Sequence, residues 1–438
     1  MAESEVSDAA LDAPPGPAQS DLDKCVHCGL CLNACPTYRE LGVEMDSPRG
    51  RIQQMIRVAG GGTIDSSYIE HMELCLACRG CETACPSGVP YGRLIEAARA
   101  GIEASREYAW PIRELRNFVF HRLLPSPRML EAVGAGLFLY QASGLQRLVR
   151  ASGVLKLMGK IGRIEALAPA IEAPFFFSRI GKTYPAEGRE RYRVAFLAGC
   201  IANLTFCRLN EATVRVLQKN GCEVTLPRGQ GCCGALHVHS GLKKEAQALA
   251  RRNIDAILDA GFDAIITNAA GCGSTLKEYG ELLHDDEAYR EKAERFSRLM
   301  KDVNEFLASI ELTAAMRSLP YSVTYQDSCH LLHGQKIRTA PRKLLRSIPG
   351  LVFREMPNSD ICCGSAGIYN VVQNDMAMRL LDRKMEAVQL TQAEVIATAN
   401  PGCILQLRAG VERKGSGQRV MHIVELLDEA YSTQKKGV

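Results

Sequence analysis

The chain has 438 residues, and its 53 lysines and arginines nearly balance its 49 aspartates and glutamates, which leaves a formal net charge of +4. Because this charge is only mildly basic and no arginine-rich run or array of aromatic residues is present, the composition does not indicate nucleic-acid binding. No apolar run approaches the roughly 18 residues that a transmembrane helix needs, so we expect a soluble or peripheral protein. Length alone predicts roughly three domains.

Residues 1–20 are acidic and rich in Ala, Pro and Ser. They lack the basic start and the apolar stretch of a signal peptide, so we expect a disordered leader rather than an export signal. The 18 cysteines would suggest disulfides in a secreted chain. Without an export signal they instead predict a reducing, cytoplasmic location.

Residues 21–107 contain the pattern Cys-x-x-Cys-x-x-Cys-x-x-x-Cys-Pro twice, ending at Pro36 and at Pro86. Such a run is typical of bacterial two-cluster ferredoxins, in which the fourth cysteine ligates the other cluster. Zinc sites also use Cys-x-x-Cys pairs, but zinc does not explain the third cysteine, the fourth and the proline, each present twice. The pattern predicts two [4Fe-4S] clusters and a chain that carries electrons. The predicted ligands are Cys25, Cys28, Cys31 and Cys85 for cluster 1, and Cys75, Cys78, Cys81 and Cys35 for cluster 2.

The segments around these runs have helical patterns. Ser47-Pro48 forms an N-cap and first-turn pair before residues 49–56, and residues 91–99 have helical periodicity, so we expect an all-helical first domain. Residues 108–190 combine short apolar runs with scattered Arg, Lys and Pro, which predicts a linker of short amphipathic helices. Such helices could lie on an anionic membrane surface, or their basic faces could be solvated while they pack on a neighbouring domain.

The rest of the chain is a duplication, with repeats at 191–315 and 316–438. Four cysteines recur at offsets of 129, 130, 130 and 131 residues, which chance does not readily produce. In both repeats, strand-type segments precede the first and last cysteine and helical segments lie between them. This order favours a parallel α/β sheet with the cysteines at the carboxyl ends of strands. The repeated cysteines are Cys200, Cys232, Cys233 and Cys272, and Cys329, Cys362, Cys363 and Cys403.

The predicted fold class is therefore α + α/β: a helical ferredoxin-like domain, a helical linker and a duplicated α/β cysteine-rich domain. Each repeat supplies four sulfurs that could bind a further iron-sulfur cluster or a metal ion. The alternative is that these cysteines only pack in the core. Cys207 and Cys222 have no counterparts in the second repeat, and we expect core packing for both.

The sequence gives weaker evidence for a functional role of other candidate residues. Arg49 and Arg51 could face cluster charge, a partner or solvent, and we expect Asp327 to cap a helix or turn rather than to act as a base. No Gly-rich dinucleotide fingerprint and no nucleophile-base pair is present, so we predict no catalytic residue and no site for an organic substrate. Four histidines near the repeat cysteines could ligate metal, relay protons or form structural hydrogen bonds: His237, His239, His330 and His333.

Several motifs together resemble one family, the iron-sulfur subunit of bacterial glycolate oxidase (glycolate dehydrogenase), whose cysteine-rich repeats are called CCG domains. The resemblance covers nearly everything after the leader and is carried by residues 25–29, 35–38, 46–52, 81–89 and 400–403. It implies a complex in which a flavoprotein subunit with FAD oxidises glycolate to glyoxylate, while this type of chain passes electrons to a quinone or another membrane acceptor. It also implies a cytoplasmic chain that could be peripheral on the cytoplasmic face of the inner membrane.

A departure from a related family narrows this expectation. The cysteine-rich repeats of heterodisulfide reductases end in Cys-x-x-Cys, whereas here Thr275 and Gln406 occupy the last positions. A stand-alone reductase is therefore disfavoured relative to electron relay. Glycolate is favoured over lactate or glycerol-3-phosphate by resemblance alone. A further hypothesis makes the repeats a docking scaffold with structural metal.

Overall fold

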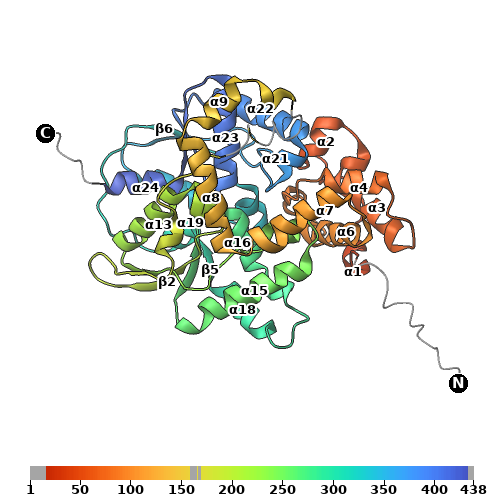
Figure 1. Ribbon diagram of the computed structural model, residues 1–438, viewed down its shortest axis with the longest axis horizontal. Coiled ribbons are helices and arrows are strands. Elements are labelled where there is room, and N and C mark those ends of the chain that lie inside the picture. Colours follow the sequence, from red (N-terminus) through yellow and green to blue (C-terminus); the bar gives the residue numbers. More distant parts are fainter. Residues whose placement is uncertain (1–15, 158–164, 166–168, 433–438) are drawn as a thin grey trace. The chain divides into compact units, whose positions relative to one another are not determined.

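The computed structural model describes residues 16–157, 165 and 169–432. Most of the predicted disordered leader, residues 1–15, lies outside the described residues, as does part of the predicted linker. The chain divides into two compact units, whose elements are labelled in Figure 1. The first unit holds the residues up to Ile112 together with Leu236–Lys243, and the second holds Arg113–Ala235 and Lys244–Val438. This division is coarser than the domain bounds expected from sequence, which stay predictions.

The first unit is helical, as the sequence predicts. Its central helix begins where expected, because the Ser47 Oγ accepts a hydrogen bond from Gly50 N at 3.0 Å and so caps the first turn. Leu22, Met55 and Tyr68 are among the fully buried side chains of its core. The helices are α1 (Gln19–Leu22), α2 (Pro36–Leu41), η2 (Glu44–Asp46), α3 (Pro48–Ala59), α4 (Ser66–Glu73), α5 (Gly80–Thr83), α6 (Tyr91–Ser105) and α14 (Ala235–His239).

The described part of the predicted linker is also helical. Within the residues that the structure describes, no helix is both long enough and apolar enough to cross a membrane. The linker elements are α7 (Trp110–Asn117), η3 (Phe118–Leu123), α8 (Pro127–Ala142), α9 (Leu145–Ala151), α10 (Val154–Leu157) and η4 (Phe176–Arg179).

Two sheets organise the rest of the second unit. The first repeat has the strand order β1-β3-β2-β4-β5 and the second has β7-β6-β8-β9. All pairings are parallel except that of β1, so the two sheets share one topology once β1 is set aside. This confirms the expected duplicated α/β fold. The strands are β1 (Thr183–Tyr184), β2 (Tyr192–Phe196), β3 (Cys222–Thr225), β4 (Ala264–Thr267), β5 (Met300–Asp302), β6 (Ser322–Tyr325), β7 (Val352–Arg354), β8 (Val395–Thr398) and β9 (Arg419–His422).

The last strand of each repeat leads directly into a capped helix. Asp302 caps α19 and His422 caps α24, and in both cases a glutamate three residues later completes a capping box. Buried side chains of both repeats belong to one hydrophobic core. The helices of the repeats are α12 (Ala202–Thr205), α13 (Cys207–Lys219), α15 (Lys243–Ile257), η5 (Leu258–Ala260), α16 (Ala270–Lys277), α17 (Tyr279–Leu282), α18 (Arg290–Leu299), α19 (Val303–Ser309), η6 (His330–Gly334), α20 (Thr339–Ser347), α21 (Tyr369–Val372), α22 (Asn374–Thr391), α23 (Pro401–Lys414) and α24 (Ile423–Tyr431).

Candidate metal centres

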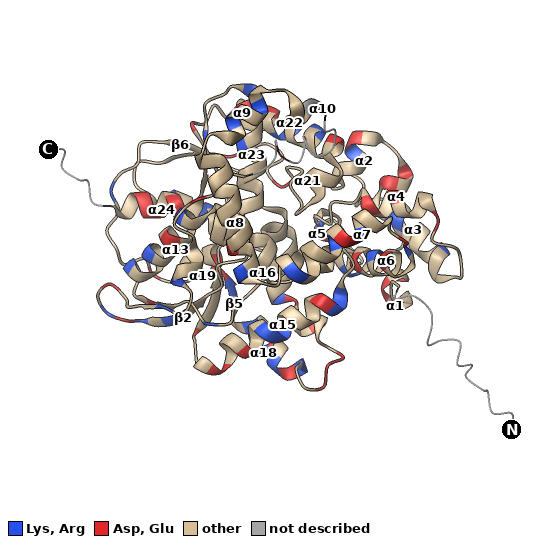
Figure 2. Ribbon diagram, viewed as in Figure 1, with Lys and Arg blue, Asp and Glu red and all other residues tan. Residues whose placement is uncertain are grey.

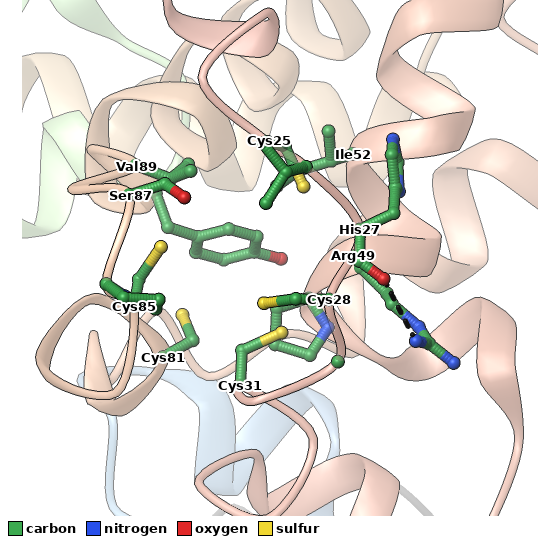
Figure 3. A pocket seen from close by; sticks show the side chains of 15 residues that line it. Cys25, His27, Cys28, Cys31, Arg49, Ile52, Cys81, Cys85, Ser87 and Val89 are labelled. Carbon is green, nitrogen blue, oxygen red and sulfur yellow. Dashed lines mark hydrogen bonds between the residues drawn. The ribbon is translucent and has the colours of Figure 1, made fainter.

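The first unit contains a partly open cavity between the two ligand runs. Figure 3 shows the cysteines of both runs around this cavity, with sulfur atoms on its walls. Cys81 of the second run also contributes to the lining. The cavity therefore gathers the four cysteines expected around cluster 1: Cys25, Cys28, Cys31 and Cys85.

A second cavity lies beside the first. Cys81 and Tyr91 line both cavities, so the two share a wall. The thiols of the second set are more protected, since most are buried, whereas Cys28 of the first set is exposed. This cavity gathers the four cysteines expected around cluster 2: Cys35, Cys75, Cys78 and Cys81.

Each cavity is lined by a full set of four predicted cysteine ligands. Zinc needs its sulfur ligands about 2.3 Å from one point. Among the residues that the structure describes, no group of three or more His, Cys, Asp or Glu could hold a metal ion in this way. Four cysteines spread around a cavity match a [4Fe-4S] core, which takes four cysteine ligands.

Both ligand runs fold through the same turn. The second residue after the first cysteine has a positive φ in each run, 53° at His27 and 51° at Ala77. The fourth residue does too, at 83° for Gly29 and 62° for Arg79. Glycine adopts this backbone without a Cβ penalty, while Arg79 is held there by an ion pair with Glu82 at 3.0 Å. Because the backbone turns at the same positions in both runs, the two ligand loops have similar backbone conformations.

Burial keeps some of these thiols protonated. It raises the pKa of Cys31 and takes the pKa of Cys81 well above its usual value. Because thiolates rather than thiols bind metal, cluster assembly must displace these protons.

Arg51 brings a positive charge to the second cavity. Its side chain is 0% exposed and lines that cavity. The guanidinium donates to Asp46 O at 2.6 Å, to His71 O at 2.7 Å and to Thr37 Oγ1 at 3.2 Å. Its Nη1 also lies 3.9 Å from Cys35 Sγ. Of the uses considered for Arg51, the structure supports a position against the predicted ligands of cluster 2.

Arg49 has a different environment. It forms a partly exposed ion pair with Glu44 at 2.6 Å, and its Nη1 donates to His27 O at 3.2 Å. Arg49 therefore braces the first ligand loop and also lines the first cavity, beside the predicted ligands of cluster 1.

The first repeat gathers its cysteines at the carboxyl ends of parallel strands, where ligands collect on such sheets. Cys200 follows β2, and Cys272 lies near the start of α16 after β4. Hydrogen bonds link Cys200 to Cys232, Cys232 to Cys233, and Cys233 to Cys272. These bonds, together with burial, raise the pKa of Cys200 and Cys233 well above the usual value.

The second repeat repeats this arrangement. Cys329 follows β6, and Cys403 lies near the start of α23 after β8. Hydrogen bonds link Cys329 to Cys362, Cys362 to Cys363, and Cys363 to Cys403. Each predicted set is thus gathered in one place, and binding of a cluster or metal by either set stays a prediction.

Other expectations have mixed outcomes. Cys207 and Cys222 belong to the hydrophobic core, as predicted. Asp327 does not cap a helix; its Oδ2 accepts from Arg342 Nη2 and from Ser359 Oγ, both at 2.7 Å. The sequence could not show this, because Arg342 is 15 residues away in the chain.

The four histidines have separate environments. His237 and His239 belong to the first unit, whereas the cysteines of the first repeat belong to the second. His239 Nδ1 lies 3.3 Å from Glu96 Oε1, and burial lowers the pKa of His239 to about 4. His333 Nε2 pairs with the carbonyl of Asp360 at 3.1 Å. His330 packs near Gly271 of the first repeat.

Buried polar residues behind the Cys-Cys loops were missed in the sequence. Tyr279 Oη donates to Cys233 O at 2.9 Å, and Asn253 Nδ2 donates to Cys232 O at 2.9 Å. In the second repeat, Lys384 Nζ donates to a neighbouring turn. The one clue in the sequence is that Asn253 and Lys384 stand 131 residues apart, the same offset as the last repeated cysteines.

Three family models match four parts of the chain. A 4Fe-4S dicluster domain matches residues 21–89. The linker region of the glycolate oxidase iron-sulfur subunit matches residues 111–168. The cysteine-rich CCG domain matches twice, at residues 194–277 and 323–408.

Relatives that align over nearly the full length of the chain agree with these family matches. The chain is 43% identical to the probable glycolate oxidase iron-sulfur subunit of Bacillus subtilis (strain 168), over 94% of both chains. It is 33% identical to the glycolate oxidase iron-sulfur subunit of Escherichia coli (strain K12), over 94% of this chain and 95% of the relative. Lactate utilization protein A of Bacillus licheniformis is 31% identical but covers only 54% of this chain. The matching order of dicluster domain, linker and two cysteine-rich domains, together with these identities, places the chain in the family of glycolate oxidase iron-sulfur subunits.

Proposed function

We propose that this chain is the electron-transfer subunit of a glycolate dehydrogenase complex. In this role it takes electrons from an FAD-containing flavoprotein subunit that oxidises glycolate to glyoxylate, and it passes them to a quinone or another membrane acceptor. The proposed ligands are the two sets of four cysteines around the cavities of the first unit. Bound [4Fe-4S] clusters would supply the one-electron chemistry.

The adjacent cavities are the observation that carries this proposal. Each is lined by three cysteines of one run and the fourth of the other, and Cys81 belongs to the wall between them. Two redox centres held on either side of one wall would be neighbours, as relay of charge between them requires. Cys28 is exposed, which supports a first centre whose edge lies at the surface of its unit, where a partner protein could exchange electrons with it.

The cysteine-rich repeats support relay rather than disulfide reduction. Thr275 and Gln406 replace the last cysteine of the reductase pattern, and both are buried. Gln406 Oε1 accepts from Asn370 Nδ2 at 3.2 Å, so this position has a structural hydrogen bond where the reductases have a thiolate.

Metal analysis and spectroscopy test the proposal. In protein purified without oxygen, we expect at least about eight irons with matching sulfide, counting four per cluster, and reduced-state EPR signals of interacting [4Fe-4S] centres. Zinc on these cysteines, or disulfides between them, would contradict it. With the flavoprotein present, glycolate should reduce the clusters while lactate and glycerol-3-phosphate should not.

We further infer a peripheral membrane location on the cytoplasmic side, where the proposed acceptor resides. Figure 2 shows that α8 is almost free of charged residues, while α9 carries basic ones. Leu139 on α8 and Leu148 on α9 are 66% and 68% exposed. Exposed leucines beside arginines suit an anionic lipid surface. Sedimentation with anionic vesicles should fall in Leu148→Glu, and equal binding to neutral vesicles would contradict the electrostatic part.

A further inference from the structure

The two cysteine-rich sites have matching backbones. Each Cys-Cys pair is followed by a glycine with a left-handed backbone, at φ 85° for Gly234 and 89° for Gly364. A Cβ on Gly234 would lie 3.4 Å from the Cα of Ala246, and one on Gly364 would lie 3.1 Å from the Cα of Ala377. These contacts align α15 with α22 at an offset of 131 residues. Seven residues further along, the two helices carry different side chains.

In the first repeat this position is Asn253, which is fully buried. Its amide accepts from Gly231 N at 2.8 Å and donates to Cys232 O at 2.9 Å and to Tyr279 Oη at 3.0 Å. Tyr279 in turn donates to Cys233 O at 2.9 Å. Burial takes the pKa of Tyr279 well above its usual value, so the phenol stays neutral. The support behind the first Cys-Cys pair therefore carries no charge.

In the second repeat the same position is Lys384, which is only 3% exposed. Its ammonium donates to the carbonyls of Asn358 at 2.7 Å and Ser359 at 3.2 Å. Within the described part of the chain, no carboxylate oxygen comes within ion-pair distance of Lys384. Buried ammonium groups are normally paired with a counter-charge. The two carbonyls belong to the turn at residues 357–360, so the ammonium is held at the base of the loop that carries Cys362 and Cys363. Burial lowers the pKa of Lys384, and negative charge on Cys363, Cys362, Asp360 and Asp327 opposes that shift.

This difference matters for what each site can hold. A cluster bound by four thiolates carries net negative charge, and such charge is costly in a dry interior unless a cation compensates it. The first repeat offers neutral dipoles at this position, whereas the second offers a buried ammonium. We propose that the second repeat binds an iron-sulfur cluster through Cys329, Cys362, Cys363 and Cys403 with Lys384 as its buried counter-charge, and that the first repeat remains a set of thiols.

This inference rests on the proposed role as an iron-sulfur subunit and fixes the number of clusters at three. Iron content of the anaerobically purified full chain tests it. We expect about twelve irons per chain, counting four per cluster. Cys362→Ser should lose about four of them, whereas Cys232→Ser, the matched change in the first repeat, should lose none.

Variants of Lys384 then test the counter-charge. Lys384→Asn installs the residue of the first repeat and should lose about four irons, while Lys384→Arg should retain them. The thermal unfolding midpoint of the iron-free protein separates loss of charge from loss of fold. If Lys384→Asn keeps all its iron, the role of Lys384 is overturned. If it does not fold, the two serine variants still decide which repeat holds the cluster.

The outcomes separate this inference from the proposed function. Eight irons in the wild type, or sixteen, or equal loss in the two serine variants, would overturn the inference while leaving the two centres of the first unit intact. Fewer than eight irons, with the ferredoxin EPR signals absent, would instead contradict the proposed function.

Discussion

Both units of this chain contain a duplicated cysteine motif, but the two duplications are built differently. In the first unit the ligand runs exchange cysteines, since Cys35 lines the second cavity and Cys85 the first. In the second unit each repeat gathers four cysteines at its own sheet. Exchanged ligands make the ferredoxin sites depend on each other, whereas self-contained repeats are free to differ.

In each unit the two copies differ in the burial or charge of the side chain beside them. Arg51 is fully buried beside the second cavity of the first unit, while Arg49 lines the first cavity, is partly exposed and pairs with Glu44. Lys384 lies behind the second Cys-Cys pair, while Asn253 lies behind the first. Charge and hydrogen bonds near sulfur set the potential of an iron-sulfur centre. We therefore expect any centres bound by these duplicated cysteines to differ in potential.

The largest expected effect separates the two ferredoxin sites. Cys75→Ser, in the buried set, should lose about four irons and markedly lower the thermal unfolding midpoint, because bound metal stabilises the fold of its ligand loops. Cys28→Ser, at the exposed edge, should lose similar iron with a smaller fall in the midpoint. Iron analysis with thermal unfolding measures both, and an equal fall would show that burial does not distinguish the sites.

Arg51→Met should affect both stability and redox behaviour. Removing one partner of a buried ion pair costs about 3–5 kcal/mol, and Asp46 is the partner left behind. Loss of the positive charge should also lower the reduction potential of the second centre, by at least about 59 mV for a tenfold change in a one-electron equilibrium. EPR-monitored titration measures this shift.

Two further variants control for general damage. Arg49→Met removes a charge from the same helix turn and should leave the potential of the second centre nearly unchanged. Asp46→Asn removes the counter-charge and should raise that potential. A shift of the same sign in Arg51→Met and Asp46→Asn would contradict the electrostatic account.

The spacing of residues in the sequence was enough to predict the cysteine sets and the fold class. Ligand runs at fixed intervals and strand-cysteine-helix order are local patterns, and they predicted cysteine sets that line common cavities in the first unit. The short strands β5 and β9 were not predicted, because residues 300–302 and 419–422 are too few to show alternation.

The buried cations were beyond sequence reasoning for a different reason. Lysine and arginine are almost never fully buried, so composition favours solvent for both Arg51 and Lys384. Arg49 and Arg51 are two residues apart in the first turn of α3. Residues with this spacing point in different directions on a helix. Which arginine points inward depends on where α3 packs, and that is a tertiary property.

A smaller effect concerns the matched caps at the ends of the two repeats, Asp302 and His422, both fully buried. Burial raises the pKa of Asp302 to about 7, so its contribution to stability is present below about pH 4 and is lost as pH rises through 7. Burial lowers the pKa of His422 to about 4, so its contribution is present above about pH 6.5 and is lost as pH falls through 4.

Urea unfolding midpoints across pH 4 to 8 measure this contrast. Asp302→Asn should flatten the decline toward pH 8, and His422→Gln should flatten the decline toward pH 4. Curves parallel to the wild type in both variants would mean that other groups dominate the pH dependence.

The smallest effect tests how the two arginines acquire different environments. Ser47→Ala removes the N-cap of α3 and should cost about 1 kcal/mol of unfolding free energy, measured by chemical denaturation. Ser66→Ala, at an exposed first-turn position of α4 where Asp65 is the cap, should cost far less. If the cap of α3 helps to hold Arg51 in place, a frayed first turn should loosen Arg51 and speed iron loss from the second centre more than from the first. Equal rates from both centres would show that packing of the helix, rather than its cap, positions Arg51.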